Sequence, residues 1–83
     1  MDIDKYEKAA HIAQEISFAF EDSYHDKEQR EMFFTFFSKY LPRVDPEGTM
    51  TPYDAMVLLW RTYPDEFEHM IKEMEDKELI SDL

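Results

Sequence analysis

Residues 51–67 read TPYDAMVLLWRTYPDEF, and this stretch decides the fold. Thr51 is a favourable helix N-cap, Pro52 suits the first helical position, and the Asp54 carboxylate lies where it can reach free backbone amides. These three signals predict that a helix begins here. The next proline along the chain ends or sharply kinks it, so we expect the helix over 51–62.

The helix expected over 51–62 is apolar almost all around. Placed at about 100° per residue, its apolar side chains point in nearly every direction, which is typical of a buried element. We therefore expect it to be the central helix, with Trp60 as the keystone of the core. The apolar residues of this segment are Tyr53, Ala55, Met56, Val57, Leu58, Leu59, Trp60 and Tyr63.

A second helix is predicted on the N-terminal side, over 26–41. Asp26 followed three residues later by Gln29 is typical of a capping pair, and Pro42 ends the helix. The apolar side chains between these signals cover roughly 200° of the helix, wider than the face of a surface helix. We therefore expect contacts with more than one neighbour. The segment 42–50 holds the only glycine and predicts an ordered loop.

Two amphipathic helices are expected on either side of this pair. The segment 4–22 carries one continuous apolar stripe, and the segment 64–77 carries a narrower stripe of roughly 100° with acidic residues opposite. The tail 78–83 is expected either to fray or to dock separately through its apolar residues. The first stripe comprises Tyr6, Ala9, Ala13, Ile16 and Phe20, the second Phe67, Met70, Ile71 and Met74, and the tail residues are Leu79, Ile80 and Leu83.

No segment alternates apolar and polar residues as a half-buried strand does, so strands are not expected. The sequence predicts an all-α fold, a small four-helix domain with a central apolar third helix. Residues 1–83 are expected to form one helical domain, because a chain of this length buries a single core. The expected helices are 4–22, 26–41, 51–62 and 64–77, followed by the short tail 78–83.

The composition favours a folded protein in a reducing compartment. With 7 Phe, 5 Tyr and 6 Met, the chain has enough bulky side chains for a compact core despite its charge. It contains no cysteine, no apolar run close to the roughly 20 residues that span a bilayer, and no N-terminus typical of a signal peptide. We expect a soluble, cytoplasmic protein.

The strongest compositional feature is acidity. The chain has 20 Asp and Glu against 9 Lys and Arg, a formal net charge of −11. This charge repels nucleic-acid phosphates and anionic lipids and attracts basic surfaces. We therefore expect a basic protein partner, no direct contact with nucleic acid and no contact with a membrane. Most of the acid lies on the first and last helices, which would present one acidic surface if they lie side by side.

Such a surface can imitate a phosphate backbone. Carboxylates three or four residues apart on a helix have Cβ atoms about 5–6 Å apart, the same order as the spacing of phosphates along a strand. The sequence thus suggests an inhibitor that occupies the basic surface of a nucleic-acid-binding protein or enzyme. The alternative is an acidic surface that serves solubility alone. The candidate partner-binding residues are Glu7, Glu15, Phe18, Asp22, Asp65, Glu68, Glu75 and Asp76. In being small, acidic, aromatic-rich and free of cysteine, the chain resembles phage-encoded inhibitors of host nucleic-acid enzymes, a likeness of class rather than of motif.

Phe18 is the one aromatic residue of the first helix that falls outside the apolar stripe. It lies in line with Glu15 and Asp22, and a ring within a polar surround is typical of an interface hot spot. The alternative is that another helix covers Phe18 inside the domain.

A different class of function remains open. Met32 and Phe34 mark the two edges of the wide apolar face of the second helix. If the domain leaves them uncovered, the protein is a structural helical subunit that homodimerises or docks on a partner through this Phe/Met face, and the acid serves solubility. If neighbouring helices flank the second helix on both sides, they cover this face, and it offers no surface for self-association.

No motif indicates catalysis, a metal or another cofactor, and we expect a protein that is not an enzyme. Glu66 and His69 form only half of the carboxylate–histidine pattern of di-iron bundles, and the remaining signals are as weak. The segment 45–54 is similar in layout to a calcium-binding loop. It is too short, lacks a glycine at the required position and ends in Asp54 rather than glutamate, so no calcium ligand is assigned.

Overall fold

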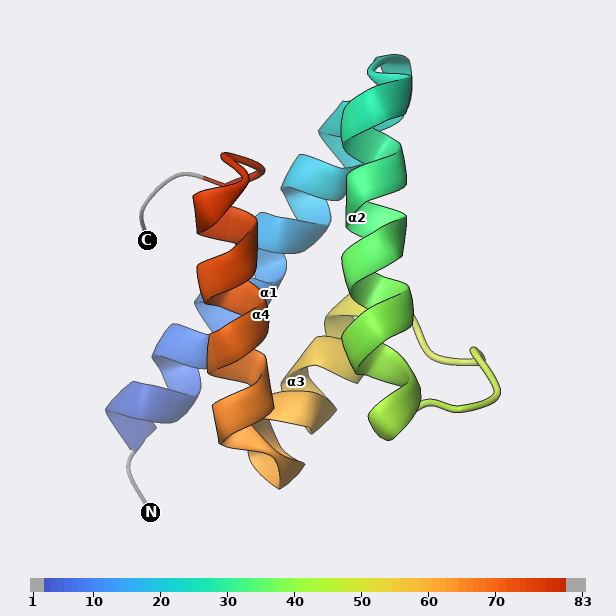
Figure 1. Ribbon diagram of the computed structural model, residues 1–83. Coiled ribbons are helices and arrows are strands. Elements are labelled where there is room, and N and C mark those ends of the chain that lie inside the picture. The colour runs from blue at the N-terminus through green and yellow to red at the C-terminus, as the bar shows by residue number, and fades with distance from the viewer. Residues whose placement is uncertain (1–2, 81–83) are drawn as a thin grey trace.

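The computed structural model describes the backbone of residues 3–80 and the side chains of residues 7–80. Over this part of the chain the protein is all-α, with four α-helices and no strand, as the sequence predicts (Figure 1). The elements are α1 (Ile3–Asp22), the 3₁₀ helix η1 (Ser23–His25), α2 (Lys27–Tyr40), the 3₁₀ helix η2 (Leu41–Arg43), α3 (Pro52–Thr62) and α4 (Pro64–Asp76). Every α-helix begins and ends within one residue of the bounds expected from the sequence.

The predicted caps account for this agreement. The Asp26 carboxylate accepts a hydrogen bond from the backbone N–H of Gln29 at 3.1 Å. The Thr51 hydroxyl accepts one from the N–H of Asp54 at 3.2 Å, and Pro52 is the first residue of α3. Each bond satisfies one backbone donor that the first turn of a helix leaves free. The starts of α2 and α3 are therefore encoded locally.

The loop between η2 and α3 is ordered by one aspartate. The two carboxylate oxygens of Asp45 accept hydrogen bonds from the backbone N–H groups of Thr49 at 3.0 Å and Met50 at 3.1 Å. Gly48, which directly precedes Thr49, adopts a φ of 68°, a conformation that glycine enters without a steric penalty. This loop is a fixed connection, as its composition predicts.

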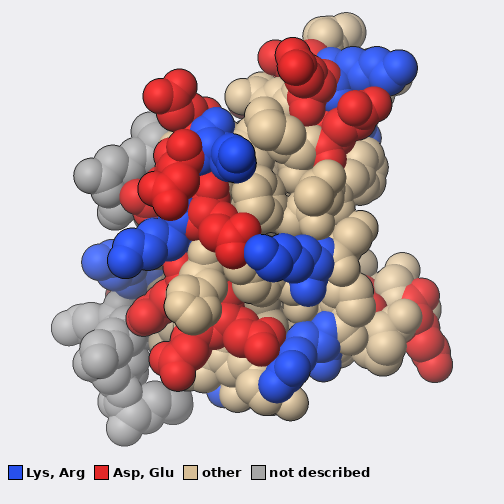
Figure 2. Space-filling model, viewed as in Figure 1, with Lys and Arg blue, Asp and Glu red and all other residues tan. Residues whose placement is uncertain are grey.

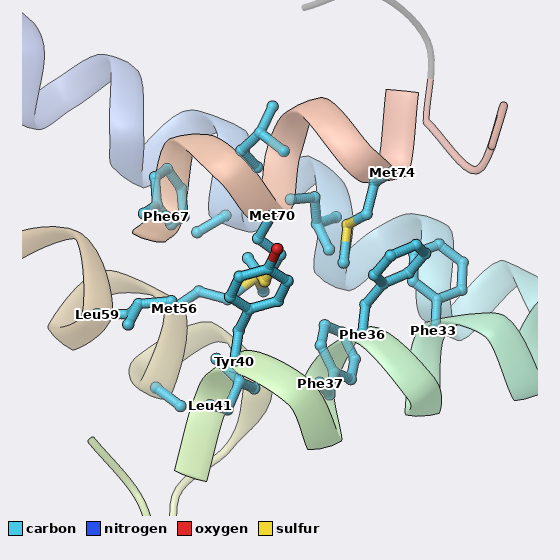
Figure 3. Packing of buried hydrophobic residues seen from close by; sticks show 14 of the residues in the cluster. Phe33, Phe36, Phe37, Tyr40, Leu41, Met56, Leu59, Phe67, Met70 and Met74 are labelled. Atoms are coloured by element: carbon cyan, nitrogen blue, oxygen red, sulfur yellow. The ribbon is translucent and has the colours of Figure 1, made fainter. Parts of the chain in front are cut away.

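The helices pack around one core. α3 contacts both α1 and α4, and α4 also contacts α2 (Figure 1). In Figure 3, Met74 points from α4 toward the ring of Phe36, and Tyr40 points from α2 toward Met56 and Met70. The largest fully buried side chains are Ile16, Phe33, Met56, Leu59, Met70 and Met74, with Ser23 as the one polar member.

Two expectations for α3 were wrong in detail. Ala55, Met56 and Leu59 are fully buried and place α3 between its neighbours, but Tyr53 and Leu58 are exposed. Trp60 is only partly buried and packs against the edge of the core, so it is not the keystone. A helix with apolar residues on every side need not be buried on every side, because much of the surface of a folded protein is apolar.

The wide apolar face of α2 is covered except along one edge. Phe33, Phe36, Phe37 and Tyr40 are buried, and Met32 is partly buried against the core. Phe34, at the other edge, is 49% exposed. α2 thus has several neighbours, as expected, and leaves one ring in contact with solvent.

A Schellman motif ends α4 and turns the tail back onto the core. The N–H of Leu79 donates to the carbonyl oxygen of Met74, and the N–H of Glu78 donates to that of Glu75, both at 2.9 Å. Glu78 lies in the left-handed region with a φ of 58°. Leu79 and Ile80 are consequently buried, so the described part of the tail docks rather than frays. The expected contact of Leu83 lies outside the described residues.

Candidate partner-binding surface

The outer face of α1 carries a single stripe of predicted site residues. Glu7, His11, Glu15, Phe18 and Asp22 follow one another at spacings of 4, 4, 3 and 4 residues, which keeps them on one side of a helix. The opposite side carries the buried residues Ala9, Ala13 and Ile16. We call these five residues the α1 stripe. It extends over roughly 22 Å at 1.5 Å per residue.

Phe18 is exposed at the C-terminal half of the α1 stripe. Half of its surface, 50%, remains accessible, so none of the described helices covers it fully. Glu7 and Asp22 are exposed, while Glu15 is half-buried and its Oε1 lies 3.9 Å from Nε2 of His11. The structure therefore brings together the four α1 residues that the sequence singled out.

The outer face of α4 holds the other four predicted residues but is mixed in charge. Asp65, Glu68 and Asp76 are exposed and Glu75 is half-buried. Lys72 lies four residues from both Glu68 and Asp76, in the middle of this face. Figure 2 shows red carboxylates interspersed with blue Lys and Arg over the side of the molecule where α4 lies. This face is not a continuous wall of negative charge.

The two sets of carboxylates also remain on separate helices. α1 packs chiefly on α3, and α4 packs on α3 and α2, so α1 and α4 are not principal neighbours of each other. The merged surface that side-by-side packing would create is therefore not formed by direct contact of these two helices.

Two further carboxylates of α4 are engaged inside the domain. Lys39 Nζ lies 2.9 Å from Oε1 and 3.0 Å from Oε2 of Glu73, and the Tyr40 hydroxyl donates to the same carboxylate. About two turns earlier on α4, Arg43 Nε lies 3.4 Å from Oε1 of Glu66. These contacts join the end of α2 and η2 to α4. Their carboxylates are consequently not free for a partner.

The Lys39–Tyr40–Glu73 contact shifts the pKa of each of these three side chains. The hydrogen bond from Tyr40, and then that from Lys39, lowers the pKa of Glu73 below 4.5. The bond to Glu73 raises the pKa of Lys39, and burial followed by the same bond raises the pKa of Tyr40. Sequence reasoning missed this cluster because its members are 33 and 34 residues apart and no local pattern links them.

A second exposed aromatic surface lies where α1 turns into α2. The guanidinium carbon of Arg30 lies 4.7 Å from the ring centroid of Phe20, 5.4 Å from that of Tyr24 and 5.5 Å from that of Phe34. Tyr24 is 70% exposed. We call these four residues the arginine–aromatic tip. The only signal for it in the sequence is Phe34 at the edge of the apolar face.

The described residues offer little support for other kinds of site. Among side chains 7–80, no three His, Cys, Asp or Glu residues converge in a way that could hold a metal ion, and His69 is exposed. Within the same part of the chain, no helix combines the length and the apolar character needed to cross a bilayer. Comparison of the chain with protein-family models, with curated proteins and with solved structures finds no significant match.

Proposed function

We propose that this protein is an acidic binding module that docks the α1 stripe on a basic protein surface. The observation that carries the proposal is Phe18, a ring that stays half exposed among carboxylates on the outer face of a well-packed helix. Burying a phenylalanine fully is worth about 1.5–3 kcal/mol, so its exposed half leaves roughly 1 kcal/mol for a partner to recover.

The carboxylates and the ring have different roles in this proposal. Glu7, Glu15 and Asp22 attract a basic surface over about 8–10 Å and orient it, which raises the association rate. Phe18 then enters an apolar recess and slows dissociation, as hot-spot rings do. Binding should therefore depend on salt through its rate of association and on Phe18 through its rate of dissociation.

Charge density sets the kind of partner. The α1 stripe places three carboxylates over a length in which a nucleic-acid strand, at about 3.4 Å per phosphate, places roughly six. It is thus a sparse acidic surface with an apolar anchor rather than a copy of a phosphate backbone. In the more specific form of the proposal, the partner is a nucleic-acid-binding protein or enzyme, and the module inhibits it by covering Lys and Arg that otherwise hold phosphates.

A second candidate function rests on Phe34. Its exposure keeps open a structural subunit that homodimerises or docks through the apolar edge of α2. Met32, the opposite edge, is partly buried against the core, so only one side of that face is offered. The high net charge also opposes close approach of two copies.

Charge reversal with a matched control tests the proposal. The full chain carrying Asp22→Lys is compared with Glu47→Lys, which makes the same change in net charge on the loop before α3. Proteins captured from a lysate by the wild type are expected to be retained by Glu47→Lys, lost with Asp22→Lys and lost at high salt. Displacement by duplex DNA supports the inhibitor form. Equal capture by both variants contradicts the use of the α1 stripe.

A further inference from the structure

The arginine–aromatic tip is held rigidly from within. The Phe20 ring meets that of Phe34 edge-to-face at 5.2 Å and 85°, and it meets the ring of Phe37 at 5.3 Å. The Ser23 hydroxyl donates to the carbonyl oxygen of Phe20 at 2.6 Å, which ties η1 to the end of α1. A pre-organised surface loses little conformational entropy when a partner binds it.

Arg30 packs against three of the rings of the tip. Its guanidinium lies over three rings, and within residues 7–80 it forms no ion pair with a carboxylate. Stacking on aromatic faces leaves the edge of a guanidinium free to donate hydrogen bonds. Tyrosine and arginine are residue types enriched at interface hot spots. The tip therefore has the composition of a contact surface, in addition to the exposure of Tyr24 and Phe34.

The charges around the tip indicate the chemistry of its partner. Five exposed carboxylates and one exposed lysine, Lys27, lie at the C-terminal end of α1 and at the N-cap and first turns of α2, and none of the carboxylates takes part in an ion pair within the described side chains. They favour a basic occupant and oppose both an acidic one and a second copy of this chain. The carboxylates are Glu21, Asp22, Asp26, Glu28 and Glu31.

We infer that the tip is an apolar docking surface for a protein whose recess is lined by apolar side chains and rimmed by lysine or arginine. Tyr24 and Phe34 enter this recess, Arg30 donates to it, and the surrounding carboxylates pair with its rim. The inference rests on the proposed function and deepens it, because Asp22 is both the last residue of the α1 stripe and one of the carboxylates near the tip. The partner then touches the molecule along α1 and over the turn into α2.

Two synthetic peptides test the inference. Both peptides carry the same number of lysine and arginine residues. The remaining residues are glycine and serine in the first peptide and leucine and tryptophan in the second. Titrated into the full chain by calorimetry, the second peptide is expected to bind about tenfold more tightly, the effect of one hot-spot contact. Tyr24→Ser and Phe34→Ser are each expected to remove this advantage. Leu58→Ser, an exposed apolar residue on α3, is the matched control and is expected to retain it.

The outcomes separate the inference from the proposed function. If both peptides bind equally and Asp22→Lys weakens the binding of both, the tip is not an apolar docking surface. The proposal of an acidic binding module is then retained. If neither peptide binds and Asp22→Lys also leaves lysate capture unchanged, both fail. A loss with Leu58→Ser as large as with Tyr24→Ser overturns the inference, as does a sedimenting dimer that Tyr24→Ser dissociates. Thermal unfolding of Tyr24→Ser, which changes a largely exposed side chain, confirms that a loss of binding is not a loss of fold.

Discussion

Replacing Glu78 with glycine is expected to stabilise the protein, because Glu78 occupies a position suited to glycine. It has a φ of 58° at the turn that ends α4. A residue with a Cβ in this left-handed region carries roughly 1–2 kcal/mol of strain. Glycine removes the strain but makes the unfolded chain more flexible, which offsets roughly 0.5–1 kcal/mol. The net gain in the free energy of unfolding is about 0.5–1 kcal/mol.

Thermal unfolding followed by circular dichroism measures this gain. In a domain of 60–100 residues, 1 kcal/mol shifts Tm by about 4–8 °C, so Glu78→Gly is expected to raise Tm by about 2–8 °C. Glu78→Ala is the matched control, because it removes the same charge from the C-terminal end of a helix and retains the Cβ. If Glu78→Ala stabilises as much as Glu78→Gly, the gain comes from charge, and the backbone reasoning is refuted.

Two further variants test the core and the contact between α2 and α4. Phe33→Ala is expected to lower the free energy of unfolding by about 3–5 kcal/mol because Phe33 is fully buried, and Phe34→Ala by about half of that or less. Equal losses in urea unfolding would contradict the burial of one ring and the exposure of its neighbour. The pKa of Glu73 is lowered in the folded state, so the stability it contributes is present above its ordinary value of 4.5 and is lost as pH falls through the folded pKa. Glu73→Gln is therefore expected to flatten the acid side of the stability profile, and an unchanged loss below pH 4.5 would show that another group causes it.

The helix boundaries were accessible to sequence reasoning because their causes are local. Thr51 and Asp26 cap helices through hydrogen bonds to residues three positions away, and Pro52 needs only its own ring geometry to begin α3. The outward position of Phe18 was likewise predictable from helical periodicity alone.

The remaining features depend on how helices meet. Trp60 was expected in the core, and only the packing of α3 against α1 and α4 decides which of its sides is covered. Lys39 contacts Glu73, and Arg30 lies over Phe20, so each contact links residues of two different helices. The periodicity within a single helix cannot predict such contacts. The same holds for the two acidic sets, whose union would require α1 and α4 to be principal neighbours.

The function proposed here depends on the outer face of α1 as a docking surface, and Phe18→Ser tests it most directly. The side chain is half exposed, so the variant is expected to fold with a Tm close to that of the wild type. Its Kd for a basic protein captured through the wild-type chain, measured by calorimetry at low salt, is expected to rise about fivefold, the equivalent of the roughly 1 kcal/mol that the exposed half of the ring leaves for a partner. A folded Phe18→Ser that binds with the wild-type Kd contradicts the proposal.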